Sequence, residues 1–248
     1  MPIEYPSAVS ALGTWSRWCG ALPREATTSI ALLQLPPMPG VPEPLAGRFR
    51  VAVRFAWTGD PAEGAAVLAP IRAVAPPLID AVGVMPYAAL GAIHADPVDP
   101  IPVREVSALV AALPAGAIDR LLAVAGQESG SLQLMVELRQ LGGAIAARGA
   151  LRGIPVPGAF TGSDAAFSLF VVGVDAPPFS EAVRAHGDAL AEAMAPWLTG
   201  FVLPNFAPGG DAARFRRVFP PETLGRLRAI STTYDPAGVL LAARGLFA

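Results

Sequence analysis

The sequence predicts an α+β fold in which a ferredoxin-like antiparallel sheet has its helices packed on one face. The main observation is a pair of strand–helix–strand units, separated by a middle section of the chain. Neither unit contains a G-x-G-x-x-G fingerprint or the alternating pattern of a long parallel sheet. A doubly wound, Rossmann-type fold is therefore not expected.

The first unit opens on an alternating strand. Apolar side chains recur at every second position of Arg48–Thr58, which is typical of a half-buried strand. Asp60 and Glu63 form a capping box around Pro61, a residue that suits the first helical turn. The predicted helix ends at a Pro-Pro pair, and a second strand is expected over Leu78–Met85.

The second unit starts at Asp164 and has the same order of elements. A strand is predicted over Ala165–Val174, where apolar residues are nearly continuous. Two prolines precede a helix predicted over Phe179–Trp197, and the chain is expected to return as a strand over Thr199–Phe206.

The rest of the chain supplies accessory elements. No linker or low-complexity tract interrupts it, so residues 1–248 are expected to form a single domain. The further predictions are a helix over Ser7–Gly20, a strand over Ala26–Leu35, a helix over Pro114–Ala125, a strand over Ser131–Leu141, a loop over Leu151–Ser163 and a helix over Pro221–Ser231.

The composition excludes several classes of function. The chain has 248 residues, 53% of them hydrophobic, and a formal net charge of −2, so it lacks the basic excess that nucleic-acid binding needs. It contains no lysine, which removes Schiff-base chemistry. The longest apolar run, Phe167–Val174, is far shorter than the ~20 residues of a membrane-spanning helix. No secretory signal is visible either, so a cytoplasmic protein without membrane contact is expected.

Metal binding and nucleophilic catalysis are not expected. His94 lies near Asp96 and Asp99 in a proline-rich stretch, where aspartates satisfy turn backbone and one imidazole is too few ligands for a zinc site. The single cysteine, Cys19, shares a predicted helix face with Trp15. That position favours a buried, inert thiol.

Polar residues on an otherwise apolar strand are the remaining candidates. In residues 132–141 the aliphatic side chains share one parity, while Glu137 and Arg139 share the other and point away from the helices. Two interpretations stay open: a solvent-exposed salt bridge, or a face that covers a ligand or another domain. In the second, Glu137 is a candidate catalytic base. Asn205 could cap a turn or hydrogen-bond to a planar ligand such as the edge of a flavin.

Six stretches occur in a characteristic order along the chain. They are VRFAWTGDPAEGAAVLAPIRA, PPLIDAVGVMPYAAL, MVELRQLGGAIA, AAFSLFVVGV, the PNF of residues 204–206, and RLRAISTTYDPAGVL. In this order they resemble the C-terminal portion of bacterial FAD-linked oxidases of the berberine bridge enzyme-like (BBE-like) group, in the vanillyl-alcohol oxidase superfamily. The resemblance covers nearly the whole chain.

The resemblance implies a substrate domain, whose open sheet face covers the flavin held by an FAD-binding domain that this chain lacks. It implies that Asn205 contacts the flavin and that Tyr87, Arg139, Gln140 and Leu203 lie on the substrate face. Leu203 stands where relatives carry a tyrosine, so a tyrosine base at that position is excluded.

Two functions from different classes follow. The first is the substrate-binding part of an FAD-dependent oxidoreductase, which oxidises a small organic molecule or secondary metabolite by hydride transfer to flavin. Such a chain is truncated or needs a separate flavin-domain partner, and it is inactive alone. The alternative is a non-catalytic, stand-alone ligand-binding protein or dimeric scaffold derived from that domain. Both predict an exposed apolar patch on the face that would cover the flavin.

Overall fold

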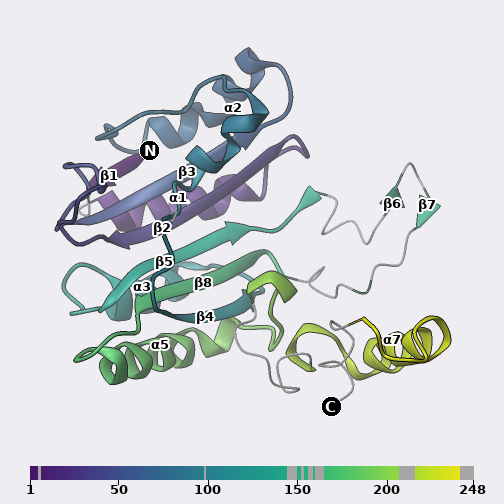
Figure 1. Cartoon of the computed structure of the whole chain (residues 1–248). Helices are drawn as coiled ribbons and strands as arrows, with labels where there is room; N and C mark the ends of the chain where they lie inside the picture. The colour runs from purple at the N-terminus through teal and green to yellow at the C-terminus, as the bar shows by residue number, and fades with distance from the viewer. Residues whose placement is uncertain are drawn as a thin grey trace.

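A six-stranded sheet forms the centre of the computed structural model, in the order β1-β3-β2-β5-β8-β4 with every neighbouring pair antiparallel (Figure 1). The structure describes residues 1–4, 7–97, 99–143, 150–151, 154–155, 159, 165–206 and 216–240. The strands of the sheet are β1 (Pro2–Glu4), β2 (Ala26–Gln34), β3 (Phe49–Trp57), β4 (Val103–Val110), β5 (Gln133–Gln140) and β8 (Phe167–Val174). A separate antiparallel pair consists of β6 (Ala150–Leu151) and β7 (Ile154–Pro155).

Helices pack on one face of this sheet. They are α1 (Ala8–Cys19), α2 (Pro61–Arg72), α3 (Ala115–Ala125) and α5 (Ser180–Met194), and their buried residues share one hydrophobic core with the strands. Helix α7 (Pro221–Tyr234) extends beside the sheet, with only Leu224 buried (Figure 1). The predicted α+β fold, an antiparallel sheet with helices on one face, is confirmed. No helix in the described ranges is long and apolar enough to cross a membrane.

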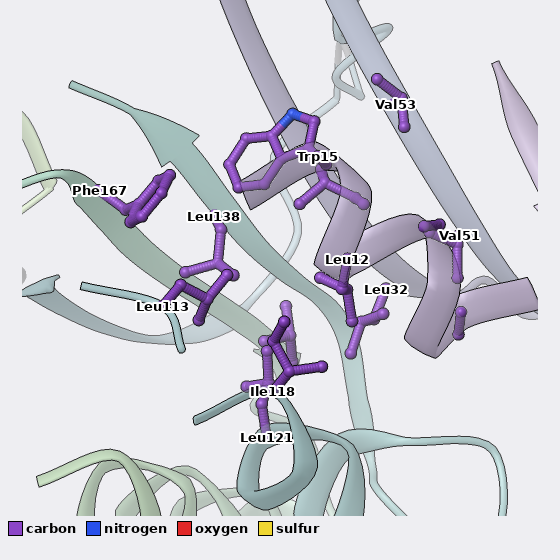
Figure 2. Close-up of a cluster of buried hydrophobic side chains, with 14 of the residues drawn as sticks. Leu12, Trp15, Leu32, Val51, Val53, Leu113, Ile118, Leu121, Leu138 and Phe167 are labelled. Carbon is purple, nitrogen blue, oxygen red and sulfur yellow. The ribbon is translucent and has the colours of Figure 1, made fainter. Parts of the chain in front are cut away.

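Trp15 lies at the middle of the core (Figure 2). Its side chain is completely buried, its ring centroid lies 5.2 Å from that of Phe167, and its indole N–H donates to Thr28 Oγ1 at 3.0 Å. At the end of the same helix, Cys19 is 6% exposed, and burial raises the pKa of its thiol far above the ordinary value. The prediction that this thiol is buried is confirmed.

The start of α2 follows the predicted cap. The Asp60 carboxylate accepts hydrogen bonds from the backbone N–H groups of Ala62 at 2.8 Å and Glu63 at 3.3 Å. These are two of the donors that the first helical turn leaves without intrahelical partners. Pro61 occupies the first helical position and needs no such partner.

Replacing Asp60 with alanine is expected to lower the free energy of unfolding by about 1 kcal/mol, because both bonds are lost. Urea denaturation followed by circular dichroism measures the change. Asp60→Ser is the matched control, since a serine hydroxyl can cap the same N–H groups. Equal stability of Asp60→Ala and the unchanged protein would show that the cap contributes nothing.

The second half of the chain has the ferredoxin-like order. Strand β8 lies between β5 and β4, so β4, α3 and β5 form a split unit around it. The next segment runs beside β4, where the Thr199 N–H donates to the Leu109 carbonyl at 2.9 Å and the Leu109 N–H donates to the Phe201 carbonyl at 2.8 Å. The predicted strand over Thr199–Phe206 is nevertheless wrong: the chain has a left-handed Gly200 and ends in the 3-10 helix η5 (Pro204–Phe206). Pro204 has no N–H to extend the ladder.

The predicted strand over Leu78–Met85 is also wrong. This segment is irregular and is followed by the 3-10 helix η2 (Tyr87–Ile93). Prolines precede and follow it. The Leu78 N–H donates to the Pro2 carbonyl of β1 at 2.8 Å, but among the described residues this contact does not continue as a ladder, and Val84 is 86% exposed. Strand β4, which pairs with β8, was not predicted from the sequence. Asp164 and most of the predicted loop over Leu151–Ser163 lie outside the described residues.

The sheet face opposite the helices is called the open face below. Between η2 and β4 the chain runs across this face (Figure 1), and this stretch is called the crossing segment below. His94 on the crossing segment lies 3.7 Å from a carboxylate oxygen of Glu137. Ala31, Leu33 and Ala52 form a small apolar cluster on this face, and each is at most 7% exposed. The predicted exposed apolar patch is therefore wrong, because the described part of the open face is mostly buried and is charged at its centre.

Candidate functional site

The centre of the open face carries a group of interacting polar side chains: Ser29, Arg54, His94, Glu137 and Arg139, called the Glu137 cluster. Three adjacent strands supply all but His94. Ser29 on β2 lies opposite Arg54 on β3 and opposite Arg139 on β5, so these three residues form one row across the sheet. Glu137 lies two residues before Arg139 on β5, so both side chains are on the same face of the sheet.

Both carboxylate oxygens of Glu137 are held by donors. One accepts from Ser29 Oγ at 2.6 Å and from Arg54 Nη1 at 2.6 Å. The other accepts from Arg139 Nε at 2.7 Å and Nη2 at 2.7 Å. The Glu137 side chain is 0% exposed, against 12% for Arg54 and 26% for Arg139. The predicted Glu137–Arg139 salt bridge exists, but the interpretation that places it in solvent is wrong.

His94 covers the cluster from the crossing segment. Its Nδ1 lies 3.7 Å from Glu137 Oε1, and its side chain is 30% exposed. Burial lowers the pKa of His94 below its ordinary value; Glu137 and the more distant Asp96 raise it, whereas the two arginines lower it further. The lowered pKa favours the neutral form of the imidazole, so His94 contributes little positive charge to the cluster at pH 7.

Arg139 forms the outer edge of the cluster, beside two aromatic rings. Its guanidinium carbon lies 4.6 Å from the centroid of Phe206 and 5.9 Å from that of Phe170, both within the range of cation–π attraction. The two rings are 4.8 Å apart. The Ser107 hydroxyl donates to the Phe206 carbonyl and ties η5 to the open face. Asn205, next to Phe206 on η5, is exposed.

Ser168 is the cross-strand neighbour of Arg139 on β8, on the same face of the sheet. It is 1% exposed, and its hydroxyl has no hydrogen-bond partner among the described residues. A buried hydroxyl without a partner has lost its hydration without compensation. The site thus contains one unsatisfied donor directly beside a partly exposed guanidinium.

Ser168→Ala is expected to raise the free energy of unfolding by about 1 kcal/mol, because it removes a buried polar group that lacks a partner. Ser107→Ala is the matched control, since Ser107 is also buried on this face but donates to Phe206. The control is expected to change stability by about the same amount in the opposite direction. Urea denaturation of both variants measures this, and a destabilised Ser168→Ala would mean that the hydroxyl already has an acceptor.

The other predicted site residues do not all join this site. Tyr87 lies on η2 and is 86% exposed, beside the apolar residues at the start of the crossing segment. Gln140 faces the helices, and its side-chain amide donates to the Cys19 carbonyl at 3.3 Å, so its expected position on the substrate face is wrong. The same alternation that brings Arg139 to the open face takes Gln140 away from it. Leu203 is half-buried just before η5.

The sequence interpretation missed three members of the cluster. Arg54 and Ser29 both have the parity opposite to the core residues of their strands, and that signal could have assigned them to the open face. His94 was interpreted only as part of a turn, and its contact with Glu137 joins residues far apart in sequence. Among the described residues, no group of three or more His, Cys, Asp and Glu side chains is arranged to hold a metal ion.

Several solved structures that align with this chain are named as oxidases or as BBE-like proteins. The wild-type BBE-like 1 of Physcomitrella patens aligns with a TM-score of 0.72 at 13% identity, over 96% of this chain and 51% of that one. The chain has the fold of one half of a BBE-like protein. Xylooligosaccharide oxidase from Myceliophthora thermophila C1, in complex with xylobiose, gives a TM-score of 0.69 at 17% identity, over 95% and 52%. The 6-hydroxy-D-nicotine oxidase from Arthrobacter nicotinovorans gives a TM-score of 0.66 at 19% identity, over 96% of this chain and 51% of that one.

The BBE-like likeness concerns the fold, since all these identities are low. The chain spans about half the length of the structures that it matches. No family model matches the sequence, and the search of curated proteins found no match. The predicted resemblance to BBE-like oxidases is confirmed by the fold, and it was not detectable in these sequence comparisons.

Proposed function

We propose that the chain is the substrate-binding half of an FAD-dependent oxidoreductase that acts on a small organic molecule. The flavin-binding half is either a separate subunit or a further part of the same gene product. The observation that carries this proposal is the Glu137 cluster: a buried, charged group on the open face of a sheet, in a fold that this chain shares with about half of a BBE-like protein. Charged residues are almost never fully buried unless they are paired, and buried charged groups are candidates for functional sites.

The residues present fit the ring of a flavin better than its phosphates. The exposed Asn205 amide can donate to and accept from a planar ring edge. The next residue, Phe206, contacts the Arg139 guanidinium with its ring. The sequence lacks the glycine-rich loop that holds a dinucleotide phosphate, so the other half would hold the rest of FAD. When bound, the flavin supplies the acceptor for the hydride. This chain would orient the substrate and exclude water.

Flavin retention tests the proposal. The gene region next to this chain is sequenced, the flavin-binding half is co-expressed with the chain, and the purified material is examined for the yellow flavin absorbance. We expect the two halves to co-purify with FAD, and the chain alone to lose FAD on gel filtration. Anaerobic bleaching of the absorbance by added substrate then reports hydride transfer. A colourless, separately eluting chain in every case would refute the proposal.

A second function, a non-catalytic ligand-binding or dimeric scaffold protein, is favoured by the state of Glu137. Both of its oxygens already accept hydrogen bonds, which leaves no free lone pair directed at a substrate proton in this arrangement. Exposed apolar residues gather at Val84, Met85 and Tyr87, where a second copy could pack. Light scattering separates the two functions, because the scaffold forms a colourless dimer without the flavin half.

A further inference from the structure

The Glu137 cluster has more positive than negative charge. Two guanidinium groups, of Arg54 and Arg139, share the single carboxylate of Glu137, while burial favours the neutral form of His94 at pH 7. A third guanidinium on the open face, that of Arg50, is 7% exposed and is bound by the carbonyl oxygens of Pro44 at 2.8 Å and Phe49 at 3.2 Å. A carbonyl group solvates such a cation but does not neutralise it.

The acidic groups around this face do not restore the balance. Glu4 on β1 is the cross-strand neighbour of Arg50, but it is exposed, so water screens its charge. Asp96 follows His94 on the crossing segment, but it is exposed, so water screens its charge. Glu105 on β4 is half-buried at the edge strand of the sheet, with β8 between it and β5. Buried charges are costly unless they are paired, so a surplus positive charge favours the arrival of an anion.

Arg139 is where that anion could enter. It is the more exposed of the two arginines in the cluster. Its Nε and Nη2 donate to Glu137, and its guanidinium lies over the ring of Phe206. Beside it, the Ser168 hydroxyl has no acceptor among the described residues. The Phe206 and Phe170 rings offer an apolar wall, and Asn205 adds an exposed amide. Cation, unsatisfied donor and aromatic surface thus lie together.

We propose that Arg139, Ser168, Phe206 and Asn205 bind the carboxylate of an aromatic acid, which names the substrate class of the same site and in that respect rests on the proposed function. A carboxylate accepts charge-assisted hydrogen bonds from the guanidinium and one further bond from Ser168. Its ring packs on the Phe206 side, where the stacking surface lies. The ligand brings the negative charge that the cluster lacks.

Isothermal titration calorimetry tests the site. The full chain is titrated with 2-naphthoate and, in parallel, with the neutral amide 2-naphthamide. We expect naphthoate to bind about tenfold more tightly than naphthamide at low salt, and to lose that advantage as the salt concentration rises. Arg139→Gln is expected to remove the preference for naphthoate. Ser168→Ala is expected to weaken naphthoate severalfold while the affinity for naphthamide stays constant.

Arg120→Gln is the matched control, because Arg120 is an exposed arginine on α3, on the helix-covered side. It should bind naphthoate as the unchanged protein does. Equal affinity for the acid and the amide, or an unaffected preference in Arg139→Gln, would overturn the proposal. If circular dichroism shows that Arg139→Gln is unfolded, the acid–amide comparison and Ser168→Ala decide it. The titration contains no flavin, so its failure and the failure of the flavin-retention experiment are separate results.

Discussion

Glu137→Ala is expected to lower the free energy of unfolding by about 3–5 kcal/mol, because removing one partner of a buried ion pair leaves the other charges without compensation. In this protein two ion pairs are lost, since Arg54 and Arg139 both pair with the same fully buried carboxylate. Ser29 also loses its acceptor. Urea denaturation monitored by circular dichroism measures the change, and the slope of the transition shows whether the variant still unfolds in one step.

Two further variants make this result specific. Glu128→Ala removes an exposed carboxylate after α3 and is expected to change stability by less than about 0.5 kcal/mol. Glu137→Gln keeps the shape and removes only the charge, so it should lie between the other two. A loss below about 1 kcal/mol for Glu137→Ala would mean that both arginines turn into water and that the cluster is not held together by Glu137.

Trp15→Ala is expected to cost about 3–5 kcal/mol, as large-to-small changes of buried aromatic residues do. The indole is completely buried near Phe167 and other core residues (Figure 2). The Thr28 hydroxyl accepts a hydrogen bond from its N–H. Truncation leaves a cavity between α1 and the sheet, and one hydrogen bond is lost as well. The midpoint of thermal unfolding should fall with it.

The control for Trp15 lies on the same helix. Val9→Ala shortens a side chain that is 58% exposed, and it is expected to leave the free energy of unfolding within about 0.5 kcal/mol of the unchanged protein. Equal effects of the two changes would show that α1 contributes through its helical propensity and not through the packing of its buried face. A small effect of Trp15→Ala alone would contradict the close packing seen around the indole.

The sequence predicted best those elements whose pattern is local. Alternation identified β3, and the Asp60 cap located the start of α2, because both signals depend on neighbours within a few residues. The segment over Leu78–Met85 is apolar enough for a strand, but among the described residues its contact with β1 is limited to the bond from the Leu78 N–H to the Pro2 carbonyl. Whether an apolar segment becomes a strand depends on a partner elsewhere in the chain, which periodicity does not contain.

The candidate site divides in the same way. Parity along one strand predicted that Glu137 and Arg139 share a face, and the structure agrees. Their partners come from β2, from β3 and from the crossing segment. Along the sequence, His94 lies 43 positions from Glu137 and Ser29 lies 108 positions from it. Such contacts follow from the fold as a whole, so the sequence interpretation could predict the face but not the cluster.

The row formed by Arg54, Ser29 and Arg139 also bears on how β2 finds its place. The strand reads ATTSIALLQ, and its apolar residues Ile30 to Leu33 would satisfy both faces of the sheet nearly as well if β2 were displaced by two residues. A displacement that set Ala31 in the row would leave the Glu137 carboxylate without a hydroxyl donor from β2, whereas one that set Thr27 there would replace serine with a bulkier hydroxyl residue. The polar row therefore favours an alignment of β2 that places a hydroxyl between Arg54 and Arg139. Since β2 joins the strands of the first half of the chain to β5, that alignment determines how the two halves of the sheet meet.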